Sequence, residues 1–346
     1  MSNNIQLHIP AKPWLGNKPP KRVLAIRLQA MGDTVITLPY LNALRKSLPE
    51  ETQLDFLTRK EVDSIPKSLA LFNHVYSIGG KRNFYKQCVY ALFMLPRLIF
   101  RRYDVVLDLQ NNPISRYTRK ILNAKAWSEF DKYSPHAAGE RTRLTIEAAG
   151  FKSVMNAQFQ FKTGYDDEEK LLLAHGWDGA SKLVILNPAA AFGTRNWNID
   201  NYVSFAKLWL QQFPDTQFVA MGTNFIKGKA LYLKEKLRDK LICLIDRTTP
   251  AEGFKIIQRV QFVLSEDSGL MHMSWVSDKP TVAILGSTRS DWVSPQNKNS
   301  LVFSSDDLPC GNCMREFCSR GDVHCLTRYT PEFIFEKVKD FITKIE

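Results

Sequence analysis

The chain has 346 residues, of which 44% are hydrophobic and 24% charged. This length suffices for two domains with cores of their own, and the composition excludes a disordered chain. The formal net charge of +12 favours an anionic partner such as nucleic acid, an acidic membrane surface or a phosphorylated substrate. No named nucleic-acid module, membrane-length apolar run or signal-peptide pattern occurs, so we expect a cytoplasmic protein that does not bind nucleic acid.

Residues 1–20 contain four prolines and no clear period, which predicts a flexible leader. From residue 21 on, short apolar runs alternate with helix-like segments, a pattern typical of parallel βαβ units. The predicted strands are 23–28, 54–57, 75–78, 105–109, 183–186, 218–221, 242–244, 262–264 and 282–285.

This pattern starts twice, because a basic-flanked strand near residue 21 is matched by a similar strand near residue 182. The sequence therefore predicts two Rossmann-like domains, 21–165 and 166–330, followed by a closing helix over 331–346. Neither domain carries a G-x-G-x-x-G or G-x-x-x-x-G-K-[ST] loop, which disfavours an NAD-dependent oxidoreductase and a P-loop protein.

The tripeptide Met31-Gly32-Asp33 follows the first predicted strand and precedes a helix-like run that begins at Thr34. It therefore lies at the carboxyl end of a strand, where open α/β sheets bind their ligands. An ionised aspartate near a helix N-terminus can act as a general base. The alternative is an aspartate that caps the helix and has no other role.

A second group of polar residues follows the strand at 262–264, in the run Glu266-Asp267-Ser268-Gly269-Leu270-Met271-His272. A helix beginning at Ser268 or Gly269 would direct its first backbone N–H groups at a phosphate or diphosphate. Asp267 would be repelled by phosphate, so we expect it to cap the turn or to accept hydrogen bonds from sugar hydroxyls. His272 either reaches a nucleotide or is a buried, satisfied histidine.

A third group lies in the loop after the strand at 183–186, which contains Asn187, Thr194, Arg195 and Trp197. A guanidinium at a strand's carboxyl end can pair with a diphosphate through two hydrogen bonds. The alternatives are a surface arginine at 195 and a packing residue at Trp197.

Three motifs together resemble glycosyltransferase family 9, the bacterial heptosyltransferases of lipopolysaccharide core assembly. They are Met-Gly-Asp between a strand and a helix, Asn-Pro-Ala followed by Arg-Asn-Trp, and Asp-Ser-Gly-Leu-Met-His. The resemblance runs from about residue 22 to 338. It implies the GT-B architecture, in which two Rossmann-like α/β domains face a central cleft, and an inverting transferase that uses ADP-heptose and needs no metal or other cofactor.

The resemblance also implies roles for individual residues. Asp33 of the N-terminal acceptor domain matches the base, with Met31 and Gly32 in its supporting loop. In the C-terminal donor domain Arg195 matches a position that is often lysine and neutralises the donor diphosphate, with Asn187 and Thr194 in its supporting loop. The donor-binding positions are Asp267, Ser268, Gly269, Leu270 and His272. The segment 273–277 departs from the alanine-rich pattern of the family, which leaves the donor identity open.

Inverting sugar transfer needs a base for the acceptor hydroxyl and positive charge for the departing diphosphate. Because the matching residues fall in opposite domains, we expect domain closure to assemble the site. The expected partners are a nucleotide-sugar and a lipid-linked saccharide acceptor. The alternatives are a transferase with another donor or acceptor, and a non-catalytic nucleotide-sugar-binding module.

A basic and aromatic stretch occupies residues 81–102, where lysines and arginines frame apolar side chains. A basic amphipathic helix of this kind predicts weak contact with an anionic membrane, and hence a peripheral protein at the inner face of the inner membrane. The alternative is a helix that packs on the sheet and exposes a basic edge.

Four of the six cysteines cluster near the C-terminus, at Cys310, Cys313, Cys318 and Cys325. The Cys-x-x-Cys start is compatible with a structural zinc ion, although the remaining spacings are irregular. The alternative is a set of reduced or redox-labile thiols, since cytoplasmic proteins rarely form disulfides.

Overall fold

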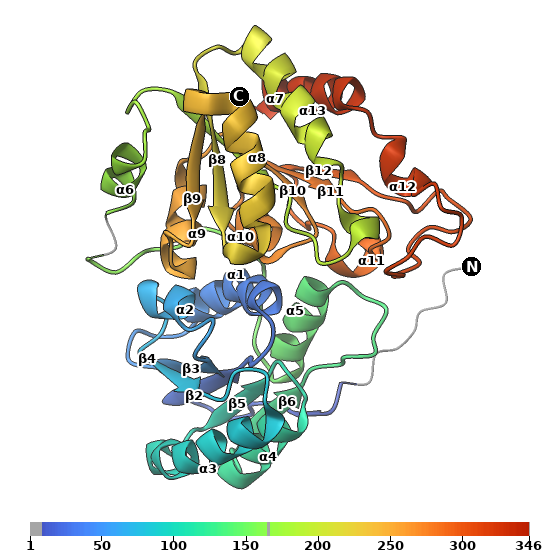
Figure 1. Ribbon diagram of the computed structural model, residues 1–346. Helices are drawn as coiled ribbons and strands as arrows, with labels where there is room; N and C mark the ends of the chain where they lie inside the picture. The colour runs from blue at the N-terminus through green and yellow to red at the C-terminus, as the bar shows by residue number, and fades with distance from the viewer. Residues whose placement is uncertain (1–8, 165–166, 346) are drawn as a thin grey trace. The chain divides into compact units, whose positions relative to one another are not determined.

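The computed structural model describes residues 9–164 and 167–345, and the chain divides into two compact units, residues 1–162 and 163–346. Each unit is a six-stranded sheet with helices on both of its faces (Figure 1). The predicted change of domain, between residues 165 and 166, falls on two positions outside the described residues.

The sheet of the first unit has the order β1-β6-β5-β2-β3-β4 and is parallel except for β1. Its strands are β1 (Ala11–Lys12), β2 (Arg22–Ile26), β3 (Gln53–Arg59), β4 (His74–Ile78), β5 (Val105–Asp108) and β6 (Ala126–Glu129). Its helices are α1 (Met31–Ser47), α2 (Ser64–Ser68), α3 (Phe84–Arg101), α4 (Pro113–Leu122) and α5 (Ala138–Ala148). Helices α1 and α5 pack together on one face of the sheet, and α3 and α4 on the other (Figure 1).

The sheet of the second unit is parallel throughout, with the order β12-β11-β10-β7-β8-β9. Its strands are β7 (Lys182–Asn187), β8 (Thr216–Gly222), β9 (Leu241–Ile245), β10 (Phe262–Glu266), β11 (Thr281–Ile284) and β12 (Ser300–Phe303). Its α-helices are α6 (Glu168–Ala174), α7 (Ile199–Gln212), α8 (Lys227–Leu237), α9 (Pro250–Arg259), α10 (Gly269–Val276), α11 (Ser290–Val293), α12 (His324–Thr327) and α13 (Pro331–Ile345). Short 3-10 turns occur at η1 (Gly193–Arg195), η2 (Asn224–Ile226) and η3 (Arg238–Lys240).

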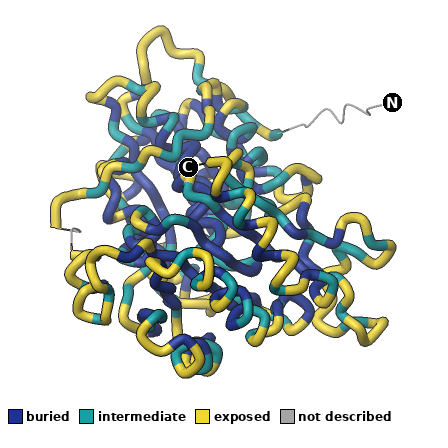
Figure 2. The backbone as a smooth tube through the Cα atoms, turned by 90° about the horizontal axis from the view of Figure 1, so that it is seen from above, coloured by how far each residue is buried: buried dark blue, intermediate teal, exposed yellow. Residues whose placement is uncertain are grey.

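The central strands carry continuous apolar runs because helices cover both sheet faces. Val23, Leu24, Ala25 and Ile26 of β2 are fully buried, and β7 and β10 are buried in the same way. Figure 2 shows dark blue, buried segments in the interior and yellow, exposed segments at the outside. Burial of this apolar surface is the main source of stability for both sheets.

Each sheet reverses its strand order next to its first long strand. In the first unit β2 lies between β3 and β5, and in the second β7 lies between β8 and β10. Crossover connections leave these strands in opposite directions, so the loops at their carboxyl ends separate and leave room for a ligand. The positions after β2 and after β7 and β10 are therefore the expected ligand sites of the two units.

All nine predicted strands are present, as β2, β3, β4, β5, β7, β8, β9, β10 and β11. The sequence did not reveal β1, β6 and β12, which are short strands at or next to a sheet edge. Their residues are paired because a neighbouring strand offers a hydrogen-bonding edge, so local composition carries little signal for them.

The prediction of a flexible leader over residues 1–20 is wrong for its described part. Ala11 and Lys12 pair with β6, and the Trp14 N–H donates to the Ala149 carbonyl over 2.9 Å. These contacts hold the segment on the edge of the sheet. Residues 1–8 lie outside the described part.

Among the described helices, none has both the length and the hydrophobicity of a membrane-spanning segment.

Candidate active site

Asp33 lies in the first turn of α1, which begins at Met31 rather than after the tripeptide as predicted. Its Oδ2 accepts a hydrogen bond from the Ala30 N–H over 3.1 Å, which satisfies one open donor at the helix start. Its Oδ1 lies 3.0 Å from Nη2 of Arg27, and the side chain is 42% exposed. The carboxylate therefore contributes to the helix start and still presents an accessible face.

Two arginines that the sequence analysis did not single out lie near Asp33. The Arg27 guanidinium is buried and lies over the Phe130 ring at 4.7 Å, and the Arg141 guanidinium lies over the same ring at 5.1 Å. Burial, together with the like charge of Arg27, lowers the pKa of Arg141. A charged residue directly after the apolar strand β2 is a usable signal for Arg27, whereas nothing in the local sequence marks Arg141.

The loop between β2 and α1 is held by the neighbouring strand. Oε1 of Gln110, just beyond β5, accepts hydrogen bonds from the Leu28 and Gln29 N–H groups over 2.9 and 2.8 Å. Met31 and Gly32, predicted as supporting residues, form the first turn of α1 between this loop and Asp33. The position of the Asp33 carboxylate is therefore set by two adjacent strands.

In the second unit, the N-terminus of α10 follows β10 directly. Ser268 is its N-cap, and its Oγ accepts a hydrogen bond from the Met271 N–H over 3.3 Å. Asn187, at the end of β7, donates from Nδ2 to Oγ of both Ser268 and Ser265 over 2.7 Å. The strands β7 and β10 are thereby tied at their carboxyl ends.

Of the two alternatives for Asp267, capping of this turn is wrong, because Ser268 does so and Asp267 points elsewhere. Acceptance of hydrogen bonds from sugar hydroxyls stays a prediction. Within the described residues no acceptor is recorded for the N–H groups of Gly269 and Leu270. These are the open donors that every helix has at its start. They give this edge of the sheet two unused hydrogen-bond donors at a positive helix end.

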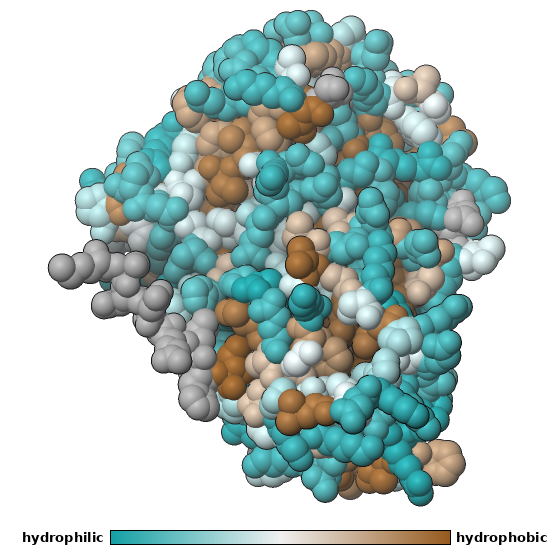
Figure 3. Space-filling view, turned by 180° about the vertical axis from the view of Figure 1, so that it is seen from behind, coloured by the Kyte–Doolittle hydropathy of each residue, from teal (hydrophilic) through white to brown (hydrophobic). Residues whose placement is uncertain are grey.

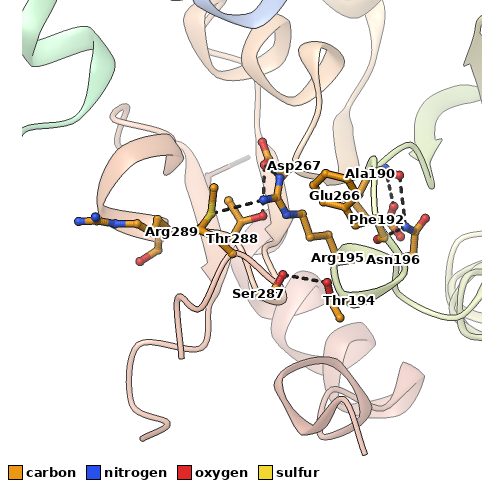
Figure 4. A network of polar contacts seen from close by, with 12 residues as sticks. Ala190, Phe192, Thr194, Arg195, Asn196, Glu266, Asp267, Ser287, Thr288 and Arg289 are labelled. Atoms are coloured by element: carbon orange, nitrogen blue, oxygen red, sulfur yellow. Dashed lines mark hydrogen bonds and ion pairs between the residues drawn. The ribbon is translucent and has the colours of Figure 1, made fainter. Parts of the chain in front are cut away.

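Arg195 and Asp267 face each other across the ends of β7 and β10 (Figure 4). Nη1 of Arg195 lies 3.4 Å from Oδ2 of Asp267, and the two side chains are only 11% and 15% exposed. Oδ2 of Asp267 also accepts from Oγ1 of Thr288 over 3.2 Å. The alternative of a free surface arginine at 195 is therefore wrong.

The remaining contacts of Arg195 fix the plane of its guanidinium. The group lies 4.8 Å above the Phe192 ring, and Nη2 is 3.4 Å from the Met314 sulfur. Its Nε is buried and has no recorded hydrogen-bond partner. A guanidinium held in a fixed orientation can bind an anionic ligand with little reorganisation.

His272 is buried, and its Nδ1 accepts a hydrogen bond from the Trp275 indole over 3.0 Å. The neutral ring must then carry its proton on Nε2, which lies 4.0 Å from Oδ1 of Asp267. The structure therefore agrees with the interpretation of a buried, hydrogen-bonded histidine, whereas contact of His272 with a nucleotide stays a prediction.

Glu266, the last residue of β10, holds the loop that carries Arg195, a positioning role that the sequence analysis did not assign. Its carboxylate accepts from the Ala190 N–H over 2.9 Å and the Trp197 N–H over 2.7 Å, at the two ends of the loop that carries Arg195. Burial raises its pKa to about 7, while the charge of Lys229 opposes that shift. The sequence signal for this role is a glutamate at the end of an apolar strand, because a buried carboxylate needs hydrogen-bond partners.

The loop that contains Arg195 is also fastened at Thr194. Its Oγ1 lies 3.0 Å from the Ser287 Oγ, and its carbonyl accepts from the Ser287 N–H over 3.1 Å. Gly286 has φ +43°, and a Cβ there would lie 2.5 Å from the Thr194 carbonyl oxygen. Trp197 is a packing residue, 1% exposed, whose indole donates to the Tyr329 carbonyl.

The four clustered cysteines line one pocket of the second unit, together with Thr194, Ser287 and His324. All are free thiols, and within the described residues no three cysteine, histidine or acidic side chains are arranged to hold a metal ion. Backbone N–H groups lower the pKa of Cys318, whereas burial and the other three cysteines raise that of Cys325 to about 11. The zinc hypothesis stays a prediction.

The two units thus offer complementary chemistry. The first presents an accessible carboxylate with two arginines close by. The second presents a buried guanidinium and two open helix N–H groups at adjacent strand ends, where an anion can be bound. Proton abstraction and stabilisation of a departing anion are the reactions that these groups support.

Comparison with known proteins gives a consistent result. The model of glycosyltransferase family 9 (heptosyltransferase) matches residues 113–324, more than half of the chain. A lipooligosaccharide heptosyltransferase 2 of Campylobacter jejuni is 29% identical over 327 residues, covering 90% of this chain and 95% of that protein.

Two solved structures share the fold. A family 9 glycosyl transferase from Veillonella parvula has a TM-score of 0.77 and 16% identity, over 94% of this chain and 97% of that one. The E. coli ADP-heptose lps heptosyltransferase II has a TM-score of 0.74 and 15% identity, over 93% and 99%. These likenesses agree with the predicted GT-B architecture of two Rossmann-like units.

Proposed function

The chain belongs to glycosyltransferase family 9, and on this premise we propose that it transfers heptose from ADP-heptose to a lipopolysaccharide core acceptor with inversion. Glycosyl transfer is the activity of the family, whereas the donor and the acceptor are our proposal. It is supported by the relatives, one of which is named as an ADP-heptose lps heptosyltransferase.

The observation that carries the proposal is the anion site at the ends of β7 and β10. Arg195 and the open N–H groups of Gly269 and Leu270 follow the adjacent strands β7 and β10, at the point where the strand order reverses. A nucleoside diphosphate carries its negative charge on oxygens that such donors bind well. When the glycosidic bond breaks, charge builds on the same diphosphate, so groups that bind the donor also stabilise the transition state.

Asp267 holds the guanidinium of Arg195 in place and keeps Oδ1 available beside His272. Since a carboxylate repels phosphate, this oxygen suits the hydroxyl groups of the transferred sugar. Asn187, Thr194 and Ser268 act as positioning residues, because their contacts fix the two loops and the helix start.

Asp33 is the proposed base, which takes the proton of the acceptor hydroxyl as that oxygen attacks the anomeric carbon. The bond to the diphosphate breaks as the new glycosidic bond forms, so the configuration inverts. Arg27 orients the carboxylate, and Arg141 adds positive charge that would attract an anionic acceptor. No cofactor enters this scheme, because Arg195 and the helix N–H groups supply the positive charge at the leaving group.

We further propose that the enzyme works in the cytoplasm and contacts the inner face of the inner membrane, where a lipid-linked acceptor is within reach. The net charge of +12 supports such a contact, since bacterial membrane surfaces and lipid-linked phosphosaccharides are anionic.

The proposal is tested by thermal shift and by transfer. We expect ADP and ADP-heptose to raise the melting temperature more than UDP, GDP or UDP-sugars at equal concentration. We also expect transfer of heptose, with inversion shown by NMR of the product, to a heptose-deficient core acceptor. Stabilisation by a uridine or guanosine nucleotide instead, with no transfer from ADP-heptose, would contradict the assigned donor.

A further inference from the structure

Helix α3 is apolar on both sides, although only one side is covered. Leu98 is buried and Cys88, Ala91 and Met94 are partly buried, and they pack on the core formed by β2 and β4. Helices that are hydrophobic all round are normally buried all round. The uncovered side of α3 therefore lacks an apolar partner among the described residues.

That uncovered side carries large apolar side chains at helical spacing. They are Tyr85, Val89, Leu92, Phe93 and Phe100, exposed by 81%, 52%, 65%, 78% and 86%. The neighbouring helix α4 adds Tyr117 and Ile121, exposed by 65% and 49%. We call these seven side chains the α3–α4 face. Figure 3 shows hydrophobic atoms among hydrophilic ones along the bottom of that view, the end of the first unit where α3 and α4 lie in Figure 1.

The charge around this face is strongly one-sided. Ten of the residues from 79 to 125 are lysine or arginine, and only Asp104 and Asp108 are acidic. Asp104 pairs with Lys125, and Asp108 is fully buried. Most of the chain's net charge of +12 thus lies in this segment.

The basic side chains at the rim are unneutralised. Lys81, Arg82, Lys86, Arg102 and Lys120 are exposed, and no ion pair is recorded for them within the described ranges. Exposed apolar side chains with a basic rim, in a segment whose two acidic residues are paired or buried, match an anionic lipid surface. Such a surface takes the aromatic groups between its acyl chains and attracts the cations to its headgroups.

We propose that the α3–α4 face docks the enzyme on the anionic leaflet of a lipid bilayer, with α3 lying parallel to the surface. This deepens the membrane contact of the proposed function and rests on that function, since the acceptor is lipid-linked. Helix α3 has 18 residues and contains Pro96, and it is not apolar enough to span a bilayer. It therefore acts as a surface anchor that brings the enzyme to its acceptor.

The experiment uses the full chain and measures co-sedimentation with vesicles of phosphatidylcholine alone or with phosphatidylglycerol. We expect binding to the mixed vesicles, and binding weakened about tenfold or more when phosphatidylglycerol is left out or salt is raised. A double variant Phe93→Ser with Phe100→Ser is expected to lower binding by a similar factor. In a charge variant, Lys81→Gln with Arg82→Gln and Lys86→Gln, vesicle binding should lose its dependence on salt.

A matched control removes exposed apolar side chains from the second unit, with Phe225→Ser and Leu231→Ser, which are 69% and 53% exposed. We expect this control to bind vesicles like the unchanged chain. Transfer to a lipid-free acceptor should stay within about twofold in all variants, because none of these residues contacts the candidate site. Thermal melts show that each variant is folded.

Vesicle binding that is equal in the Phe93/Phe100 variant and the unchanged chain would overturn the docking proposal. Failure of the unchanged chain to bind mixed vesicles would also overturn it. A further contradicting result would be an unchanged chain that sediments as a dimer and does not bind vesicles, with the dimer disrupted in the Phe93/Phe100 variant. Failure of transfer to the lipid-free acceptor would instead contradict the proposed function, and the vesicle result can be read independently of it.

Discussion

The two units carry their candidate residues at the same topological place but in opposite physical environments. Asp33 follows β2 and Arg195 follows β7, and each strand lies where the order of its sheet reverses. The Asp33 side chain is 42% exposed and forms an ion pair with Arg27. The Arg195 side chain is 11% exposed, and an aspartate, an aromatic ring and a sulfur surround it.

This difference follows from the chemistry that each group would perform. A base must reach a hydroxyl on an incoming acceptor, so it needs an open face. A site for a departing diphosphate works best when its donors are fixed before the reaction and shielded from water. The comparison predicts that variants in the first unit change turnover, whereas variants in the second change donor binding.

The largest expected effect is that of Asp33→Asn. Asparagine keeps an oxygen that can accept from the Ala30 N–H, but it cannot take a proton, so we expect turnover to fall roughly 10²–10⁴-fold. The dissociation constant for ADP, measured by calorimetry, should stay unchanged. Glu140→Gln is a matched control, because Glu140 is a paired carboxylate in the first turn of α5. Near-normal turnover of Asp33→Asn would remove the base assignment.

Arg195→Ala should have the second largest effect, on donor binding. It removes a buried cation and leaves Asp267 facing the diphosphate, so we expect ADP to bind about 10²-fold more weakly. Arg195→Lys should recover part of this loss, since it keeps the charge and loses the planar geometry. Arg289→Ala removes an arginine from the same unit that is paired with Asp291, and it should bind ADP normally. Unchanged ADP binding in Arg195→Ala would refute the diphosphate role.

Glu266 should make the second unit sensitive to pH. Burial raises its pKa from 4.5 to about 7, so the folded protein holds a proton between these values that the unfolded chain has lost. The resulting contribution to stability is fully present below about pH 4.5 and is lost as pH rises through 7, and it amounts to roughly 3 kcal/mol.

Glu266→Gln lacks this titration. The difference in unfolding free energy between the variant and the unchanged chain should therefore shift between pH 5 and pH 8, as measured by urea denaturation. Glu235→Gln, at a largely exposed position of α8, should show no such shift. A constant difference for Glu266→Gln would mean that Glu266 does not titrate in this range.

The smallest effects concern the clustered cysteines. The backbone N–H groups that lower the pKa of Cys318 favour its reactive thiolate, while Cys325 has a raised pKa. We expect iodoacetamide to modify Cys318 several-fold faster than Cys325 at pH 7.5, as measured by peptide mass spectrometry. Equal rates would contradict this order.

Metal content separates the two interpretations of this cluster. If the thiols are reduced and free, protein purified without added zinc contains far less than one metal ion per chain. All six cysteines then react with a thiol reagent after unfolding. One zinc ion per chain, lost together with thiol protection on adding a chelator, would establish the structural zinc site instead.

The sequence predicted the parallel strands well because burial on both faces demands continuous apolar runs such as Val23 to Ile26. It also brought Arg195, Asp267 and Ser268 to one edge, since strand ends in a parallel sheet share that edge. It missed the roles of Glu266 and Arg141, because these depend on which loops meet in space. Ser268 and not Asp267 caps the helix, because α10 begins at Gly269 and the residue directly before it is the N-cap.

The close approach of Gly286 to the Thr194 carbonyl has a practical consequence for protein engineering. Any side chain at position 286 must displace the segment that carries Arg195, although position 286 itself contacts no proposed reacting atom. A library built to alter donor preference should therefore hold this glycine constant and randomise positions such as Thr288, whose hydroxyl meets Asp267. Library members with any other residue at position 286 are expected to have a displaced Arg195 loop, whatever their other substitutions.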